Sequence, residues 1–212
     1  MTYGLQVISA SDYVQVDENY ANCGLIQNGT ANTGTAITVT GGLARTLIFV
    51  RIPYGKTITA YGAKNADQFN TRPGPDGLAN YAYDYRVYKR VSDLTPSNGF
   101  GLQVFDSSGR LSFDSNFGYA RLAAVAALNV TGQSSPVTIP NIGSQPWILL
   151  DPLGLCALTQ SGHREIGDVW TLMASLATNG DVSVGMGRVG SGPPPGDSDI
   201  VITGTRSIVL AR

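Results

Sequence analysis

Residues 100–119 read FGLQVFDSSGRLSFDSNFGY, and residues 3–22 read YGLQVISASDYVQVDENYAN. With a single offset of 97 positions and no gap, the two stretches share Gly-Leu-Gln-Val, a later Ser, an Asp and an Asn. Apolar and polar residues alternate in both stretches, and this period of two is typical of half-buried β-strands. The chain therefore contains the same kind of segment twice, once near its N-terminus and once near its middle.

Each of these segments is predicted to be a β-hairpin. In the second copy, the arms with Leu102 and Val104 and with Leu111 and Phe113 flank the sequence DSSG at 106–109. Asp and Ser side chains cap the backbone of turns, and Gly adopts the positive φ that closes a hairpin. The arms of the first copy contain Leu5, Val7, Val14 and Val16, and its predicted turn is 9–12.

The elements after the two hairpins also recur in the same order. Alternating TAITVT at 35–40 corresponds to SPVTIP at 135–140, and apolar TLIFVRIP at 46–53 corresponds to PWILLDP at 146–152. Short apolar runs bounded by Pro fit buried strands better than helices. Further strands are predicted at 80–91 and 181–189, and one or two more in the C-terminal IVITGTRSIVLAR.

The stretch ARLAAVAALNV at 120–130 is the one helix candidate, because of its alanines. Its β-branched Val125 and Val130, and its position directly after the second hairpin, favour a strand instead. At the corresponding position after the first hairpin, the sequence is rich in Gly, Asn and Thr and is interpreted as a loop.

The whole pattern predicts an all-β protein of β-sandwich architecture, because short strands follow one another at intervals of about 8 to 12 residues. The simplest division is two related sandwich units in tandem, 1–95 and 96–212, with the boundary in the loop at 92–99. A single larger sandwich built from both halves is the alternative, and the sequence does not separate the two.

Composition narrows the classes of partner. The 212 residues include 14 Lys and Arg and 15 Asp and Glu, and neither sign forms a run. Binding to nucleic acid needs a basic face, so we expect none. No stretch approaches the roughly 18 consecutive apolar residues of a membrane span, and the N-terminal residues do not resemble a secretory signal. Charged residues make up only 14% of the chain, which favours surfaces covered by neighbouring subunits.

Catalytic, metal and cofactor motifs are not recognised. His163, the single histidine, lies in polar TQSGHREIGD and is interpreted as a solvated loop residue. Cys23 and Cys156 lack the spacing of a zinc site. The letters GMGRVG at 185–190 match the dinucleotide fingerprint, but SGPPPGD follows and cannot form the helix that this fingerprint requires. We therefore expect a protein without enzymatic activity or cofactor.

The best candidate contact surface is aromatic. In NYAYDYRVYKRV at 80–91, three tyrosines spaced two residues apart fall on one face of the predicted strand. Tyrosine rings line protein interfaces or stack on sugars. We interpret this face as sandwich core or subunit interface, with a glycan platform as the alternative. The candidate interface or glycan contacts are Tyr81, Tyr83, Tyr85, Tyr88 and Trp147.

The stretch FGLQVFDSSGRLSFDS, with YRVYKR just upstream, resembles a family of small tail-tip or minor tail proteins of long-tailed bacteriophages. Members of this family commonly carry a Gly-Leu-(Gln/Arg)-Val strand, a D-x-x-G turn and a (V/F)-D-S ending. The first copy departs from this pattern, with Asp12 at the position of the turn Gly and Glu18 at that of the final Ser. The matching residues are Gly101, Leu102, Gln103, Val104, Asp106, Gly109, Phe113, Asp114 and Ser115.

The resemblance implies a structural component of a phage virion, made in the cytoplasm of the bacterial host and placed at the tail tip or baseplate. Its partners would be other tail proteins and further copies of itself, in a ring or multimer, and a duplicated module could contact two similar neighbours. The alternative is a host-attachment or carbohydrate-binding module that contacts a cell-surface glycan. A glycan hydrolase is the weakest interpretation, because the repeated carboxylates Asp17 and Asp114 belong to different copies.

Overall fold

The structure is a computed structural model. It describes residues 6–8, 14–17, 22–65, 67–74, 79–120, 122–130, 136–142, 145–150, 167–192 and 204–211. Most of these residues lie in strands, and their single helical turn is the 3-10 helix η1 (Val91–Asp93). The predicted all-β class is confirmed.

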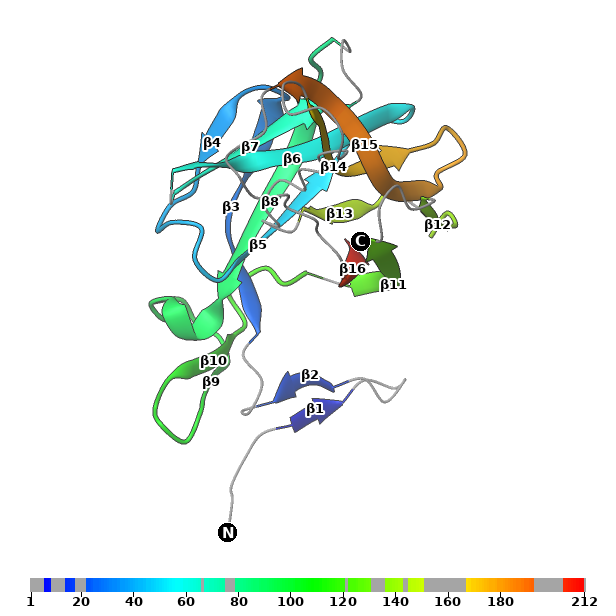
Figure 1. The fold of residues 1–212 in the computed structure, drawn as a ribbon. Coiled ribbons are helices and arrows are strands. Elements are labelled where there is room, and N and C mark those ends of the chain that lie inside the picture. Colours follow the sequence, from blue (N-terminus) through cyan, green and yellow to red (C-terminus); the bar gives the residue numbers. More distant parts are fainter. Residues whose placement is uncertain are drawn as a thin grey trace.

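Two six-stranded antiparallel sheets make up the body of the protein (Figure 1). The first sheet has the order β11 (Leu122–Val130), β16 (Gly204–Ala211), β13 (Trp147–Leu150), β5 (Thr46–Arg51), β8 (Ala82–Arg90) and β3 (Cys23–Asn32). The second sheet has the order β12 (Val137–Ile139), β15 (Val182–Gly192), β14 (Gly167–Leu176), β6 (Lys56–Asn65), β7 (Gln68–Pro73) and β4 (Ala36–Thr38).

The strand orders reveal two copies of one six-strand motif. In each of the runs β3 to β8 and β11 to β16, the first, third and sixth strands lie in the first sheet, and the second, fourth and fifth lie in the second sheet. The first strand of each run is at an edge of the first sheet, and the second strand is at an edge of the second sheet. The copies meet where β5 pairs with β13 and β6 pairs with β14, both antiparallel. At the centre of the first junction Phe49 is opposite Leu149. The two halves are therefore related by an approximate two-fold axis, and the repeat extends far beyond the hairpins.

This topology bears on the predicted boundary between residues 95 and 96. Strands from both sides of that boundary are hydrogen-bonded to each other in both sheets, through β5 with β13 and β6 with β14. The described strands therefore do not divide into two separate sandwiches; they are arranged as in the single larger sandwich. The alternation of apolar residues specifies the two faces of a strand, but it does not specify the neighbour of that strand in the sheet.

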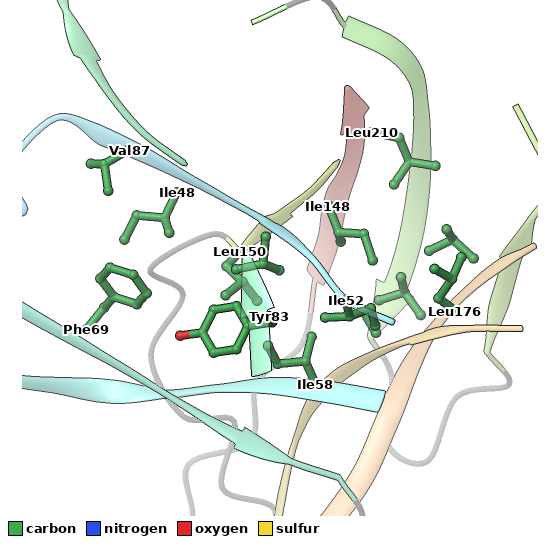
Figure 2. Close-up of a cluster of buried hydrophobic side chains, with 14 of the residues drawn as sticks. Ile48, Ile52, Ile58, Phe69, Tyr83, Val87, Ile148, Leu150, Leu176 and Leu210 are labelled. Carbon is green, nitrogen blue, oxygen red and sulfur yellow. The ribbon is translucent and has the colours of Figure 1, made fainter. Parts of the chain in front are cut away.

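One core lies between the two sheets (Figure 2). It is built mainly from Ile, Val and Leu side chains, to which Phe69 and Tyr83 add aromatic surface. The predicted apolar strands at 46–51 and 147–150 contribute from the first sheet, and Ile58 and Leu176 from the second. Burial of so many large side chains from both halves supplies the main driving force for keeping the sheets together.

Each copy of the six-strand motif is preceded by a two-stranded hairpin, β1 (Gln6–Ile8) with β2 (Val14–Asp17) and β9 (Gln103–Phe105) with β10 (Leu111–Asp114). The two hairpins have the same register, because Gln6 is opposite Asp17 as Gln103 is opposite Asp114. Each also has an irregularity at the corresponding position of the ladder. The two predicted hairpins are confirmed in their described strands.

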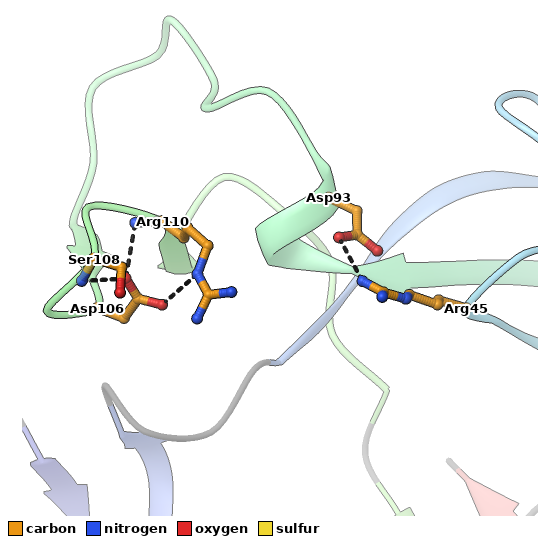
Figure 3. Close-up of polar contacts among 5 residues, drawn as sticks. All are labelled: Arg45, Asp93, Asp106, Ser108 and Arg110. Carbon is orange, nitrogen blue, oxygen red and sulfur yellow. Dashed lines mark hydrogen bonds and ion pairs between the residues drawn. The ribbon is translucent and has the colours of Figure 1, made fainter.

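The turn of the second hairpin has the predicted chemistry (Figure 3). Asp106 Oδ1 accepts hydrogen bonds from the backbone N–H groups of Ser108, at 2.8 Å, and Arg110, at 2.9 Å. Gly109 has a φ of 75°, in the left-handed region that favours glycine. The hydrogen bond from the Arg110 backbone, aided by other contacts of Arg110 and Ser108, lowers the pKa of Asp106. The turn predicted at 9–12 lies outside the described residues.

Several strands differ from the expectation. Residues 122–130 form strand β11, as predicted, but the presumed loop after the first hairpin is the ten-residue strand β3. β3 is an edge strand, so its Gly, Asn and Thr residues need to pack on only one neighbouring strand, β8. Strands β6, β7 and β14 were not anticipated.

Within the described residues, we find no helix with the length and apolar character of a membrane span.

Candidate interaction surfaces

The hairpin β9–β10 is docked on the first half of the protein. The N–H of Leu25 donates a hydrogen bond to the carbonyl of Gly118 at 2.8 Å, and Gly24 forms an antiparallel bridge with Tyr119. The segment that follows β10 thus runs beside the start of β3. These backbone contacts, together with packing of β10 on η1, fix the hairpin at this end of the sheet.

Side chains complete this docking site. Asn22 Nδ2 donates a hydrogen bond to the carbonyl of Ser112 at 3.1 Å. Gly24 allows the close approach of Phe117, since a Cβ at Gly24 would lie 3.1 Å from the nearest atoms of that side chain. Any larger residue at position 24 would push the ring of Phe117 outwards.

Asp114 is the centre of the hydrogen-bond network beneath the hairpin. It is fully buried, and its Oδ2 accepts hydrogen bonds from Ser97 N and Gln103 Nε2, both at 2.9 Å. Its Oδ1 accepts two more from Asn116, at 2.9 Å from the backbone N and 3.0 Å from Nδ2. Burial alone would raise the pKa of Asp114, but these hydrogen bonds outweigh it and hold the pKa well below its usual range. The carboxylate therefore ties the loop before the hairpin to the segment after it.

Tyr119 locks the same segment from the other side. Its hydroxyl accepts a hydrogen bond from the backbone N–H of Asp114 at 2.8 Å and donates one to the carbonyl of Asp114 at 2.7 Å. Its ring stacks on Phe113, with ring centroids 5.0 Å apart. The end of the hairpin is thus a rigid platform.

Three large apolar side chains in or just before β9 are exposed to solvent, Phe100, Leu102 and Phe105, and we call them the apolar row. Their exposed fractions are 106%, 48% and 45%, whereas Val104 on the same arm is buried. Large apolar side chains that gather on a solvent-exposed surface mark interaction sites. These three residues were not among the contacts predicted from the sequence. A signal was nevertheless present in the sequence. Residues 100–105 contain more large apolar side chains than one buried face of a short strand can hold, so some of them had to be exposed.

A second surface lies on the outer face of the first sheet, around Trp147. The guanidinium carbons of Arg86 and Arg51 are 4.1 and 4.8 Å from the centroid of the indole ring, within the range of cation–π attraction. Trp147 is only 6% exposed and clusters with Tyr88 and Phe49. Two of the predicted contacts, Trp147 and Tyr88, therefore do come together, but in a buried cluster beneath arginine side chains.

One of the arginines above Trp147, Arg51, is held by Asp84. Arg51 Nη2 donates to Asp84 Oδ2 at 2.7 Å, and Thr30 Oγ1 donates to Asp84 Oδ1 at 2.7 Å. The hydrogen bond from Arg51, followed by that from Thr30, lowers the pKa of the Asp84 carboxyl. The outer face thus carries an ordered, mixed-charge surface over an apolar base.

The other three predicted contacts face the core between the sheets. Tyr83 is 2% exposed, and burial raises the pKa of its hydroxyl to about 12. Tyr81 packs against the same core and donates a hydrogen bond to the carbonyl of Thr57 at 2.7 Å. Tyr85 lies edge-on to Phe69, with ring centroids 5.9 Å apart. This placement corresponds to the core interpretation of the tyrosine face.

The sequence candidates for chemistry are distributed as follows. His163 and Cys156 lie outside the described residues. Cys23 is a free, partly buried thiol, and burial raises its pKa. Among the described residues, no group of three His, Cys, Asp or Glu side chains is placed to hold a metal ion. The letters GMGRVG lie inside strand β15, paired with β14.

No protein-family model matches the chain, and neither the curated proteins nor the solved structures include a significant match.

Proposed function

We propose that the protein is a non-enzymatic structural component of a bacteriophage virion, a minor protein of the tail tip or baseplate that works by packing against other subunits. The carrying observation is the exposed apolar row on a hairpin that is otherwise rigidly held. A rigid apolar edge binds a partner without the entropic cost of ordering a flexible segment. The low share of charged residues agrees with surfaces that become covered in an assembly.

The residues that carry the resemblance to phage tail proteins support this proposal through what they contact. Gly101 leaves room for Ser115, because a Cβ at Gly101 would lie 2.3 Å from Ser115 Oγ. Ser115 Oγ in turn accepts a hydrogen bond from Leu102 N at 2.9 Å, and Gln103 binds Asp114. The motif thus builds the platform for the apolar row, which is a scaffold role and not a catalytic one.

The carbohydrate-binding alternative depends on exposed rings. Sugar stacking needs one free aromatic face, and of the predicted glycan contacts Tyr83, Tyr88 and Trp147 are only 2%, 3% and 6% exposed. We therefore favour packing against protein partners over a glycan platform.

The experiment that tests the proposal is antibody labelling of purified virions of the source system, viewed by electron microscopy. Label at the tail end is the expected result. Unlabelled particles, together with a soluble and monomeric protein, would contradict the proposal and would direct attention to a glycan screen. A matched pair of variants sharpens the test. Phe105→Ser should reduce incorporation into particles, whereas Ser108→Ala, in the exposed turn of the same hairpin, should not.

A further inference from the structure

The repeat between the two halves continues without a gap from the hairpin into the sheet. At the same offset of 97, residues 3–32 correspond to 100–129, which adds Leu25 with Leu122 and Asn32 with Asn129 as identical pairs. Strands β3 and β11 even have a register shift at the corresponding place, after Leu25 in one and after Leu122 in the other. The chain length from hairpin to sheet is therefore equal in the two copies.

The second hairpin is not docked on the half into which it leads. Its chain continues into β11, at one edge of the first sheet, but the hairpin itself contacts the start of β3 and η1, which belong to the other half. The second hairpin thus lies on the half of the protein that the approximate two-fold axis relates to its own half.

The two-fold axis relates the start of β3 in this docking site to the start of β11, and we define the start of β11 and the neighbouring end of β16 as the second site; in the sequence, Arg121 stands at the position of Gly24. Leu122 is opposite Ala211 there, as Leu25 is opposite Tyr88 on the first half. The first hairpin does not occupy this site in the structure. β1 and β2 pair only with each other among the described strands, and Figure 1 shows them apart from both sheets.

We propose that the hairpin β1–β2 docks on this second site of its own chain, in the position that the two-fold axis relates to that of β9–β10. Its sequence retains the residues of the internal network in which Gln103 and Asn116 donate hydrogen bonds to Asp114, whereas Tyr119 is replaced by Asn22. Gln103, Val104, Asp114 and Asn116 correspond to Gln6, Val7, Asp17 and Asn19.

The bridge between Gly24 and Tyr119 explains why the hairpin comes from the same chain. It places the segments before β3 and before β11 antiparallel to each other. In an antiparallel ladder, a step back from residue 24 along one segment is matched by a step forward from residue 119 along the other. Asn22, the last described residue before β3, is thereby directed towards the start of β11 in its own chain.

Disulfide trapping tests the proposal, because the docked second hairpin supplies a matched control. A Cβ at Gly118 would lie 3.5 Å from the Cβ of Leu25, which suits a disulfide. The control variant is therefore Leu25→Cys with Gly118→Cys. The two-fold relates this pair to the test variant, Ala21→Cys with Leu122→Cys. Both carry Cys23→Ala and Cys156→Ala and are oxidised with oxidised glutathione.

The expected result is an intrachain disulfide in most molecules of both variants, seen as faster migration of the monomer on non-reducing gels and confirmed by peptide mapping. A covalent dimer from the test variant alone would overturn the proposal, because the hairpin would then dock on a neighbouring copy. Free thiols in the test variant, with the control fully oxidised, would overturn it as well.

Hydrogen exchange of the unmodified protein provides a second measurement that does not depend on the folding of variants. Docking predicts that amides in β1 and β2 exchange as slowly as those in β9 and β10. Exchange of the first hairpin at the rate of an unfolded peptide would contradict docking. The inference stands on the duplicated fold, so its failure and the failure of the virion proposal are distinguishable.

Discussion

The backbone N–H of Ser97 donates a hydrogen bond of 2.9 Å to the buried carboxylate of Asp114. Ser97 lies between the first half of the chain and the second hairpin, and Asp114 lies at the end of that hairpin. This contact, together with the hydrogen bonds that Gln103 and Asn116 donate to Ser97, closes the loop that carries Phe100 and Leu102.

Asp114→Asn is expected to lower the free energy of unfolding by about 2 kcal/mol or more, because an amide cannot accept hydrogen bonds at both positions and buried donors lose their partner. Urea unfolding followed by circular dichroism measures the change. Asp93→Asn is the control. Asp93 forms only an exposed ion pair with Arg45 at 3.4 Å, so its replacement should change stability by less than about 1 kcal/mol. Equal effects of the two variants would contradict the central role of Asp114.

The pH dependence of stability should also report Asp114. Its pKa in the folded protein is lowered by hydrogen bonds, while an unfolded Asp has a pKa of about 3.9. The stabilisation is therefore fully present above about pH 4 and is lost as the pH falls further towards the folded pKa. Urea midpoints measured between pH 7 and pH 3 should fall more steeply below about pH 4 in the wild type than in Asp114→Asn. Parallel curves would contradict this assignment.

Phe100→Ser together with Phe105→Ser should weaken assembly with the partner and leave the free energy of unfolding nearly unchanged, because both side chains are exposed. Co-sedimentation with virions or purified tail proteins measures the first effect, and urea unfolding the second. Val104→Ala is the converse control. Val104 is buried, so the loss of two methyl groups should cost about 1 to 3 kcal/mol of stability. Assembly unaffected by loss of both phenylalanines would argue against the apolar row as the interface.

Trp147→Ala should destabilise the protein by about 3 to 5 kcal/mol, since it removes a buried indole from the outer-face cluster. Arg86→Gln should cost only about 0.5 to 1 kcal/mol, the contribution of one partly exposed cation–π contact. Thermal or urea unfolding of both variants gives these values. If Trp147→Ala instead kept full stability and abolished binding to a glycan array, the carbohydrate-binding alternative would gain support.

Sequence patterns predicted much of this fold because local chemistry decides it. Alternation located β8 and β15, continuous apolar runs located β5 and β13, and the DSSG turn located the second hairpin. β3 was missed because an edge strand, with a single neighbouring strand in its sheet, tolerates Gly and Asn. The pairing of β5 with β13 was left open because the sequence pattern of a strand does not specify which strand lies next to it in the sheet.

The candidate surfaces were predictable only in part. The period of two placed Tyr81, Tyr83 and Tyr85 on one face, but which face is buried depends on the opposite sheet. Trp147 and Tyr88 are far apart in the sequence, and only the order of strands in the first sheet brings them into one cluster. The importance of Asp114 follows from its burial and its hydrogen-bond partners. The occurrence of Asp at the same position in both copies of the repeat does not predict either of them.

The junction at the two-fold axis has a consequence for synthesis on the ribosome. Val50 pairs with Ile148, and Ile58 with Ala174, so the central ladders of both sheets join parts of the chain that are made far apart in time. Such long-range pairing is slow to form. Until β13 is complete at Leu150, strand β5 of the nascent chain has an unpaired edge, and β6 has one until β14 is complete at Leu176. The growing polypeptide therefore needs shielding by chaperones, or very rapid completion, to avoid joining with its neighbours on the same polysome.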